Sequence, residues 1–562
     1  MKSPMPEMPW VDGWTFADVL ERTAAGNANA GAVVFPGCNR SWTYGTFHEQ
    51  VRQTARGLLA IGVKHGEHVG IWATNWPEWI ALQFAAASIG AVLVNVNPAY
   101  RAHELEYVLN QADMTTLFLT DRFKSTDYFA ILNSVCPELS ESVPRALNAS
   151  RCPRLRHVVS IKEEAQAGML RWSDFIDQGR QTGDAELEAR RRATAPDDVV
   201  NIQYTSGTTG FPKGAMLTHR NLLMNAFYVG ERLSFGNQDR LCIPVPLYHC
   251  FGCVMGTLMC VIHGSAMVLP AESFDPLATL QAIQDERCTG IYGVPTMFIA
   301  QLNHPRFKEF DLSSLRTGIM AGSPCPIEVM RAVVHQMGAR DITIAYGLTE
   351  ASPVITQTRA TDSLEHRVGT VGTILPGLEV RIVQPGTLQN VVEGQPGELL
   401  VRGHGVMKGY YNKPAETAAA ITPDGWLRSG DLAQRTADGF YRITGRIKDM
   451  IIRGGENIYP REIEEFLHSH PAIADVQVVG LPDQRFGEEV CAWIRLHEGA
   501  TLDETAVKEF CRGQIAHFKV PRYVVIVDQF PTTVTGKVQK FKLREMGIER
   551  FGLQTAAGIE TA

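Results

Sequence analysis

The feature that most constrains the fold is an alternation of two kinds of segment along the N-terminal three quarters of the chain. Short runs rich in valine and isoleucine, such as 69–72 and 199–203, alternate with longer amphipathic runs, such as 51–59. Further runs of the short kind are 115–119, 158–161, 266–269 and 290–292. Strands that alternate with helices favour parallel sheets, because a parallel crossover usually contains a helix. We therefore predict an α/β fold with parallel sheets.

The length of 562 residues is more than one hydrophobic core usually holds, so we expect more than one domain. From Gly369 onward, short runs such as 379–383 and 398–402 lie between glycines and prolines, which predicts a small β-rich subdomain. After Ile451, patterns typical of helices recur at 458–467 and 505–515, and patterns typical of strands at 476–479, 490–494 and 524–527. The domains expected are a large N-terminal domain at 1–445, a hinge at 446–449 and a smaller α+β C-terminal domain at 450–562.

Two apolar stretches are long enough to suggest a membrane span. In 79–96, Gly90 separates an alanine-rich half from a valine-rich half, which favours a buried helix followed by a buried strand. In 251–269, three glycines and a histidine interrupt the run. We therefore predict no transmembrane segment.

Composition and charge narrow the class of protein further. The formal net charge is −7, which argues against a general nucleic-acid binder. Eleven cysteines, an odd number, are scattered along the chain, as expected for reduced thiols rather than a disulfide framework. The first residues lack an apolar signal sequence and an arginine-rich transit pattern, so we expect a cytoplasmic protein.

The strongest chemical signal is the segment 204–214, Tyr-Thr-Ser-Gly-Thr-Thr-Gly-Phe-Pro-Lys-Gly, directly after a predicted strand. Backbone N–H groups, hydroxyls and the Lys213 ammonium can surround a polyphosphate from several sides. The order of residues differs from that of a Walker A loop, because Pro212 precedes the lysine and Gly214 follows it. The nearby pair Cys250 and Cys253 has no second pair at zinc-ribbon spacing, which disfavours a metal site there.

This segment resembles the phosphate loop of the AMP-forming adenylating superfamily, which includes acyl-CoA synthetases, peptide-synthetase adenylation domains and beetle luciferases. Further motifs that resemble the family follow in its order at 246–252, 321–324, 345–350, 429–431, 445–451, 454–458 and 531–537. The resemblance covers about residues 15 to 545. The stretches 97–109, 454–464 and 516–522 are most similar to acyl-CoA synthetase family member two, a medium-chain fatty-acid type.

The resemblance implies an ATP site, a catalytic group and a hinge. The ATP site would comprise Thr205, Ser206, Gly207, Thr209, Gly210, Lys213, Gly322, Ser323, Tyr346, Gly347, Thr349, Asp431 and Arg446. The catalytic residues implied are Lys537, Thr208 and Glu350, and Glu350 would also hold Mg²⁺.

Individual roles follow from the same resemblance. Ser206, Thr208 and Lys213 would hold the β- and γ-phosphates. Tyr346 would stack on adenine, and Asp431 would accept hydrogen bonds from the ribose hydroxyls. In the C-terminal domain, Lys537 would bridge the carboxylate and the α-phosphate. Rotation of that domain about Lys448 would then withdraw Lys537 and bring Gly454 and Gly455 against the pantetheine arm of CoA.

The candidate substrate wall indicates what kind of acid is activated. The segment 244–260 contains no acidic residue, whereas an amino-acid substrate needs a partner for its ammonium group. Phe251, Val294 and Ile319 would line an apolar tunnel, which fits an aliphatic acid better. His249 is either a gate or substrate contact, or a buried packing residue, and the sequence leaves both interpretations open.

The primary hypothesis is a fatty acid–CoA ligase that converts a medium- or long-chain carboxylic acid, ATP and CoA into acyl-CoA, AMP and pyrophosphate. The alternatives are an adenylating enzyme for a branched, terpenoid or aromatic acid, or one with a carrier-protein acceptor. From another class, a catalytically decayed nucleotide-binding regulatory module stays open. The expected partners are a small carboxylic acid, ATP and CoA, with Mg²⁺ as cofactor, and a homodimer is compatible with the sequence.

Overall fold

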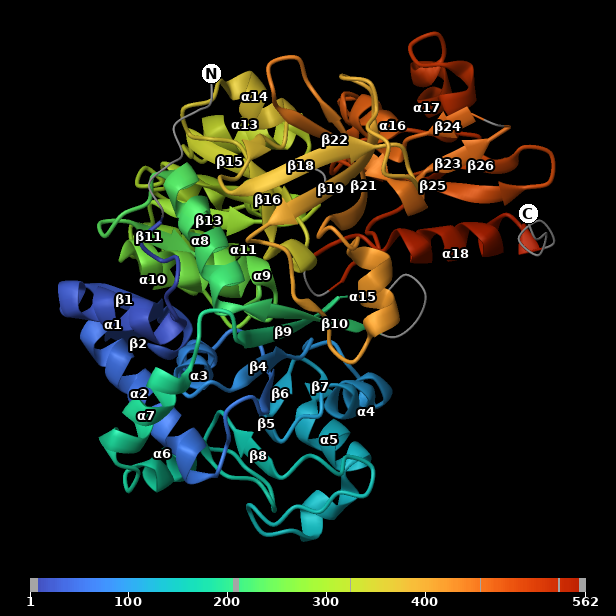
Figure 1. Cartoon of the computed structure of the whole chain (residues 1–562). Helices are drawn as coiled ribbons and strands as arrows, with labels where there is room; N and C mark the ends of the chain where they lie inside the picture. The colour runs from blue at the N-terminus through green and yellow to red at the C-terminus, as the bar shows by residue number, and fades with distance from the viewer. Residues whose placement is uncertain (1–8, 206–211, 324, 455, 534–535, 555–562) are drawn as a thin grey trace.

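The computed structural model describes residues 9–205, 212–323, 325–454, 456–533 and 536–554. Two large sheets form the N-terminal part of the molecule, and an antiparallel sheet and a separate C-terminal sheet follow in the chain. Figure 1 shows the blue and cyan sheet below, the green and yellow sheet above it, and the red C-terminal region to one side. The mixed α/β architecture with parallel sheets confirms the predicted fold class.

The upper sheet has nine strands among the described residues, and its centre is parallel. Its order is β17 (Thr373–Ile374), β16 (Val354–Gln357), β15 (Asp341–Gly347), β14 (Thr317–Ala321), β13 (Gly290–Gly293), β11 (Arg240–Cys242), β12 (Ala266–Val268), β1 (Gly31–Phe35) and β2 (Arg40–Thr43). Because β13, β14 and β15 run parallel, their carboxyl ends meet at one edge of this sheet.

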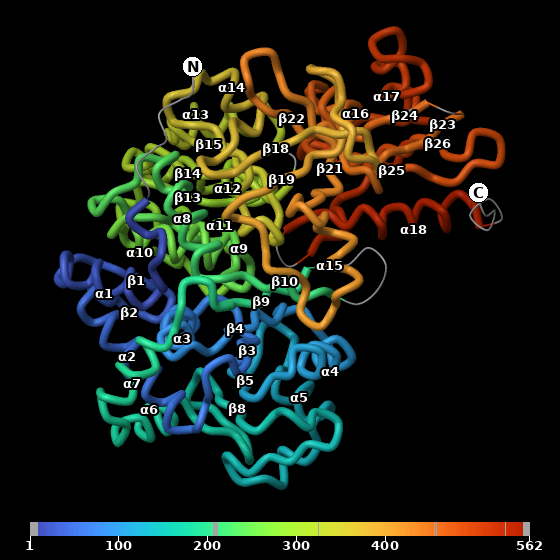
Figure 2. The backbone as a smooth tube through the Cα atoms, in the orientation of Figure 1, coloured from blue at the N-terminus to red at the C-terminus, as the bar shows by residue number. Residues whose placement is uncertain are grey.

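The lower sheet is parallel from β9 through β8 and carries an antiparallel hairpin at one side. Its order is β20 (Gly409–Tyr410), β10 (Lys213–Thr218), β9 (Val199–Thr205), β4 (Val92–Asn95), β3 (His68–Trp72), β5 (Thr116–Leu119) and β8 (His157–Ser160). The tube view shows β9 and β10 at the side of the lower sheet that borders the upper sheet (Figure 2).

The stretch 79–96 forms a buried helix and a buried strand, as predicted. Helix α3 (Pro77–Ser88) starts with proline at its first turn, where the missing N–H costs nothing, and all of its residues are buried. Gly90 turns the chain with φ +70°, and β4 then enters the centre of the lower sheet. No helix in the described part of the chain is both long and apolar enough to cross a bilayer.

Helices cover the sheets and link the parallel strands. Besides α3 and the helical segment at 250–263, those of the N-terminal part are α1 (Phe16–Asn27), α2 (Tyr44–Ala60), α4 (Ala102–Gln111), α5 (Tyr128–Val135), α6 (Trp172–Gly179), α7 (Asp184–Ala193), α8 (His219–Leu233), α11 (Pro276–Asp285), α12 (Pro295–Leu302), α13 (Ile327–Gln336), α14 (Leu364–Gly369) and α15 (Pro414–Ala420). Most of these helices pack an apolar face against the core. Helix α7 is largely exposed, as expected from its many charged residues.

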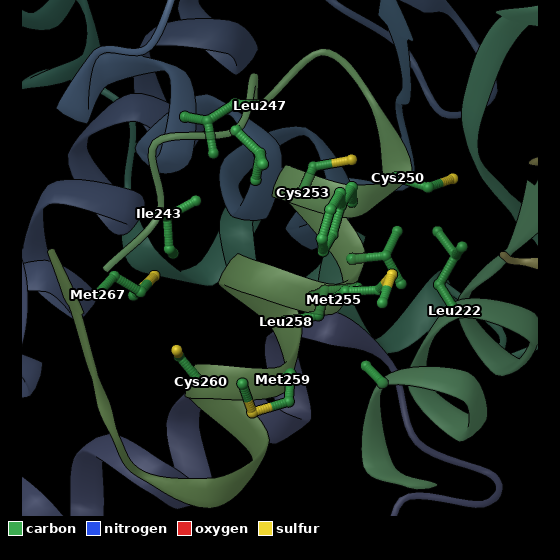
Figure 3. Packing of buried hydrophobic residues seen from close by; sticks show 14 of the residues in the cluster. Leu222, Ile243, Leu247, Cys250, Cys253, Met255, Leu258, Met259, Cys260 and Met267 are labelled. Carbon is green, nitrogen blue, oxygen red and sulfur yellow. The ribbon is translucent and has the colours of Figure 1, made fainter. Parts of the chain in front are cut away.

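The apolar run 251–269 folds as an irregular helix followed by β12. A short turn, α9 (Cys250–Gly252), leads into a π-helical segment at Cys253–Leu258 and then α10 (Met259–His263). Figure 3 shows this segment packed among buried side chains that include Ile243, Leu247 and Met267. A π-helical stretch is rare and is often found at functional sites.

The predicted β-rich subdomain is an antiparallel sheet of β18 (Leu378–Val383), β19 (Gly397–Gly403), β21 (Leu427–Arg435) and β22 (Tyr441–Arg446). The C-terminal sheet contains β24 (Glu456–Ile458), β23 (Ile451–Arg453), β26 (Gly487–Leu496) and β25 (Ile473–Asp483), with β27 (Tyr523–Ile526) parallel to β26. Its helices are α16 (Pro460–His468), α17 (Glu504–Cys511) and α18 (Lys540–Arg550).

Two helix boundaries in this C-terminal part differ from the prediction. The helix expected from Ile458 starts at Pro460, because Ile458 still pairs with Ile451 in the β23–β24 hairpin. The helix expected to reach Ile515 ends at Cys511, four residues earlier. Apolar spacing alone cannot separate a strand end from a helix start, whereas a proline at the first helical position marks the start.

Candidate functional site

The candidate site lies where β13, β14 and β15 end. Val294 follows β13, Gly322 and Ser323 follow β14, and Tyr346 and Gly347 close β15. A side chain at Gly322 would meet Val294 at 3.1 Å and Lys537 at 3.5 Å, and its φ of +91° favours glycine. The glycine therefore lets the backbone approach close to the lysine of the C-terminal region.

The predicted phosphate loop connects β9 to β10. Thr205 and Lys213 lie opposite each other at the loop end of this hairpin. The residues between them that were predicted to bind phosphate, which are Ser206, Gly207, Thr208, Thr209 and Gly210, lie outside the described residues. The hairpin thus fixes both ends of the predicted loop beside the carboxyl edge of the upper sheet.

Glu350 is the acidic centre of this arrangement. It lies in a short 3₁₀ turn (Thr349–Ala351) after β15 and is only 9% exposed. Its Oε1 accepts a hydrogen bond from the Thr205 hydroxyl at 3.2 Å and another from the Tyr410 hydroxyl at 2.8 Å. A buried carboxylate with hydroxyl donors on one oxygen is oriented by those donors.

Tyr410 also contacts Lys213, whose ammonium lies 4.5 Å from the centre of the tyrosine ring. Burial, and then the neighbouring Glu350, raise the pKa of the Tyr410 hydroxyl, so it stays a hydrogen-bond donor. Tyr410 was not predicted from the sequence. It comes from β20, which pairs with β10, and nothing in the local pattern of residues 409–411 distinguishes it from an ordinary core tyrosine.

A second polar cluster joins Tyr346, Asp431 and Arg446. The Tyr346 hydroxyl donates to Asp431 Oδ2 at 2.8 Å, and Arg446 Nε lies 2.9 Å from Asp431 Oδ1. Asp431 and Arg446 are paired across β21 and β22, so the sheet register brings them together. Burial raises the pKa of the Asp431 carboxyl, and Arg446 and the Tyr346 hydroxyl act against that rise.

Lys537 reaches this site from the C-terminal region. The preceding residue, Gly536, accepts a hydrogen bond from the Thr296 hydroxyl at 3.3 Å, and the Lys537 backbone N–H donates to the Thr533 hydroxyl. Burial, and then Arg446, lower the pKa of the Lys537 ammonium to about 8, while Asp431, Cys250 and Glu350 act in the opposite direction. The lysine therefore lies within the electrostatic reach of both polar clusters.

The predicted substrate wall is apolar and closely packed. Phe251 stacks on Tyr292 with ring centres 5.2 Å apart, and Tyr292 lies beside Ile319 on neighbouring strands. Phe251, Val294 and Ile319 are all buried. His249 lies next to them, and its Nδ1 accepts the Phe251 backbone N–H at 3.3 Å.

The charge of His249 is set by its surroundings. Burial, and then the Lys537 ammonium, lower the pKa of the His249 imidazole to about 3, so the ring is neutral near pH 7. A neutral ring costs less to bury beside an apolar wall than a charged one.

The remaining predicted residues lie at the junction and in the C-terminal sheet. Lys448 lies in a 3₁₀ turn (Ile447–Asp449) between β22 and β23. Gly454 lies in the β23–β24 hairpin with φ +60°, and its N–H donates to the Phe486 carbonyl at 2.8 Å. Figure 1 shows this hairpin toward the outer side of the C-terminal region. Gly455 lies outside the described residues.

The chain matches two family models in sequence. Residues 20–411 match the AMP-binding enzyme family, and residues 462–537 match the AMP-binding enzyme C-terminal domain. It is 54% identical to YngI of Bacillus subtilis, whose name gives acyl-CoA synthetase as an inferred activity, over 96% of this chain and 98% of the relative. It is 43% identical to the mitochondrial medium-chain acyl-CoA ligase ACSF2 of Danio rerio, over 96% and 89% of the two chains.

Solved structures agree with this relationship. The fold is similar to that of the anthranilate CoA ligase AuaEII in complex with anthranoyl-AMP, with a TM-score of 0.85, 27% identity and coverage of 96% and 98%. It is also similar to ATP-bound MatB from Rhodopseudomonas palustris, with a TM-score of 0.80, 28% identity and coverage of 94% and 98%. The chain therefore belongs to the AMP-binding enzyme family and is an AMP-forming acyl-CoA synthetase, with ATP and CoA as co-substrates.

Proposed function

We propose that the enzyme is a fatty acid–CoA ligase for medium- or long-chain aliphatic acids. The observation that carries this proposal is the wall of Phe251, Val294 and Ile319, which is buried and apolar, with Phe251 stacked on Tyr292. Residues 244–260 supply no carboxylate to pair with a substrate ammonium. The name of the relative ACSF2, a medium-chain acyl-CoA ligase, supports the same substrate class.

The reaction has two steps. In the first, a carboxylate oxygen of the acid attacks the α-phosphorus of ATP, the bond to pyrophosphate breaks, and an acyl-adenylate forms. In the second, the CoA thiolate attacks the acyl carbon, the bond to AMP breaks, and acyl-CoA is released. The position of Lys537 beside Gly322 supports a role in the first step, where its ammonium neutralises charge on the carboxylate and the α-phosphate.

Glu350 is the residue we propose to hold Mg²⁺. Thr205 and Tyr410 both donate to Oε1, so a cation would be held through the other carboxylate oxygen. Mg²⁺ prefers one or two carboxylates together with substrate phosphate oxygens and water, and a single buried glutamate beside the phosphate-loop hairpin fits that preference. When bound, the ion would neutralise charge on the phosphates.

The nucleotide contacts follow from the remaining site residues. Thr205, Lys213 and the loop 206–210 would bind the β- and γ-phosphates. Gly322, Ser323, Gly347 and Thr349 would border the adenine, with Tyr346 stacked on it. Asp431 and Arg446 would bind the ribose, and the hydroxyl of Tyr346 already occupies Asp431 Oδ2. The ribose hydroxyls would therefore share or replace that hydrogen bond.

In the second step, Lys537 must leave the site so that CoA can reach the acyl-adenylate. We propose a three-part organisation, with domains 1–445 and 450–562 and a hinge at 446–449 centred on Lys448. Rotation about this hinge would bring Gly454 and Gly455 to the pantetheine arm. The position of the β23–β24 hairpin toward the outer side of the C-terminal region is consistent with the orientation used for the first step (Figure 1).

The CoA nucleotide would meet a basic and aromatic surface on the same domain. The guanidinium groups of Arg453 and Arg485 lie 4.7 Å and 4.9 Å from the centre of the Phe486 ring, next to Gly454. Arg453 also pairs with Glu489, whereas Arg485 is exposed.

We expect Arg485→Ala to raise the KM for CoA by about three- to tenfold, a loss typical of one exposed charged contact, with little change in the KM for ATP. Steady-state kinetics with varied CoA tests this, and equal changes in both KM values would contradict it.

The low pKa of Lys537 predicts a pH dependence of the first step. The reaction needs the charged ammonium, so kcat/KM for adenylation should fall as the pH rises through about 8 in the wild type. Lys537→Arg keeps its charge at that pH, so its residual activity should lack this decline. Pyrophosphate release between pH 6 and 10 measures both profiles, and the same decline in the arginine variant would assign the titration to another group.

The substrate is tested by measuring AMP and pyrophosphate release with straight-chain acids from acetate to oleate, and with branched and aromatic acids, with and without CoA. We expect CoA-dependent turnover that peaks at a medium or long aliphatic chain. Pyrophosphate exchange without CoA-dependent product would point to another acceptor, such as a carrier protein. Nucleotide binding with no turnover for any acid would favour the decayed regulatory module, against which the gathering of Lys537, Glu350 and Asp431 argues.

The cellular location that we propose is the cytoplasm. All eleven cysteines, which fall within the described ranges, are free thiols, as is usual in a reducing compartment. The ACSF2 relatives are named as mitochondrial, so fractionation of cells that make the enzyme is the measurement that separates the two locations.

A further inference from the structure

A buried chain of polar side chains lies beneath the proposed ATP site, and two of its members, Asn201 and Gln203, have no part in the proposal above. Asn201, Gln203 and Thr205 occupy alternate positions of β9, so their side chains share one face of the lower sheet. Asn201 is 6% exposed and Gln203 is 3% exposed. Buried polar groups at the centre of a sheet are costly unless they are hydrogen-bonded, so their partners are informative.

Gln203 uses both ends of its amide group. Its Nε2 donates to Asn201 Oδ1 at 2.7 Å and to Cys253 Sγ at 3.3 Å. Its Oε1 accepts the Cys250 thiol at 3.0 Å. Figure 3 shows the sulfur atoms of Cys250 and Cys253 pointing to the same side, away from Met267. One glutamine on the lower sheet therefore holds both Cys253, the first residue of the π-helical segment, and Cys250, in the turn just before it.

The chain of hydrogen-bonded polar side chains continues from Gln203 and Asn201 in two directions. Toward the lower sheet, Asn201 Nδ2 donates to Asn95 Oδ1 at 3.0 Å, and Asn95 Nδ2 donates to the Tyr248 carbonyl at 3.0 Å. Toward the ATP site, the side chain of Cys250 interacts with that of Thr349, next to Glu350. The side chain of Thr205, two residues after Gln203 on the same face, donates to Glu350 directly.

We infer that Gln203 is a positioning residue that fixes the substrate wall and Glu350 relative to each other. It reaches Glu350 by two routes, through Cys250 and Thr349 and along its own strand through Thr205. It reaches the substrate wall through Cys250 and Cys253, which lie on either side of Phe251. Rigid support by buried hydrogen bonds is what holds reactive groups in a productive geometry.

The chain supplies a matched control in Gln83. This residue is also a buried glutamine, and it holds the same π-helical segment from α3. Its Nε2 donates to the Cys253 carbonyl at 2.8 Å, and its Oε1 accepts the Thr257 hydroxyl at 2.7 Å. Among the hydrogen bonds of the described residues, Gln83 holds Cys253 and Thr257 but not Cys250, the residue through which Gln203 connects to Thr349 and Glu350. Both glutamines therefore hold the π-helical segment, but only Gln203 also connects it to the proposed ATP site.

The test compares Gln203→Met with Gln83→Met, since methionine keeps the length of the side chain and removes its polar atoms. MgATP binding is measured by calorimetry without acid, together with the KM for the acid. We expect Gln203→Met to weaken MgATP binding by about tenfold, because buried partners lose their hydrogen bonds, and Gln83→Met to change it less than twofold. Both variants should raise the KM for the acid. Equal effects on MgATP binding, or none in Gln203→Met, would overturn the inference.

A second pair of variants covers the case in which Gln203→Met does not fold. Cys250→Ser keeps a donor for Gln203, whereas Cys250→Ala removes it at nearly the same volume. We expect MgATP binding close to wild type in Cys250→Ser and clearly weaker binding in Cys250→Ala. Equal binding by the two variants would overturn the inference. The inference rests on the proposed ATP site but not on the acid, so binding without acid separates its failure from failure of the proposed fatty-acid substrate.

Discussion

Lys537→Ala is expected to lower the rate of acyl-adenylate formation by about 10²–10³-fold, the loss typical when one preorganised electrostatic group is removed from a transition state. The ammonium is the cationic group that the C-terminal region contributes beside Gly322, and Asp431 and Glu350 lie within its electrostatic reach. Pyrophosphate release with ATP and the preferred acid measures this step. The transfer of a supplied acyl-adenylate to CoA should persist, because the proposed hinge motion removes Lys537 from the site before that step.

The control for this experiment is Lys542→Ala, which removes an exposed lysine five residues later. It should leave both half-reactions close to wild type. A Lys537→Ala enzyme that loses both half-reactions equally would contradict the proposed division between two domain orientations. A variant that retains adenylation would remove Lys537 from the first step altogether.

The sequence predicted the parallel sheets well because buried parallel strands are nearly continuous apolar runs. The runs at 69–72, 158–161 and 290–292 each coincide with an observed strand to within one residue or so at each end. The helix and strand within 79–96 were recognised because Gly90 separates them, and in the structure the chain turns at this glycine with φ +70°. Boundaries were less predictable where one apolar pattern suits two elements, as at Ile458.

The site was less accessible to sequence reasoning where it depends on contacts between distant segments. Tyr410 lies sixty residues from its partner Glu350, and only the pairing of β20 with β10 brings them together. Gln203 gave a signal that the prediction did not use, because polar residues at alternate positions of an otherwise apolar strand indicate a buried polar face.

The positive charge that the sequence predicts for the segment 512–550 also differs from the free positive charge that this segment presents in the structure. The segment 512–550 contains eight lysines and arginines against three acids, which suggests a basic patch that could attract CoA. Five of those cations form ion pairs in the structure, and the five partners all lie outside the segment: Arg512 with Glu509, Lys519 with Glu462, Arg522 with Asp483, Lys540 with Glu464 and Arg544 with Glu488. The segment therefore presents much less free positive charge than its composition implies.

Glu350→Gln is expected to raise the KM for MgATP and lower kcat for adenylation, together by about 10²-fold or more, because the proposed magnesium ligand loses its charge while its shape is kept. Glutamine can still accept hydrogen bonds from Thr205 and Tyr410, so the local geometry should survive. Tyr410→Phe removes one of these two donors and should give a smaller loss in the same direction. Initial rates over a Mg²⁺ titration at fixed ATP measure both variants.

The form of the Mg²⁺ titration distinguishes a metal ligand from a residue that only supports the fold. Loss of a ligand shifts the midpoint to higher Mg²⁺, and saturating Mg²⁺ should recover part of the rate. Loss of support lowers the rate equally at every Mg²⁺ concentration and lowers the melting temperature. Glu365→Gln, at an exposed glutamate, controls for the change of net charge. An unchanged midpoint in Glu350→Gln would leave the buried carboxylate as a partner of Thr205 and Tyr410 and would place the magnesium site on other residues.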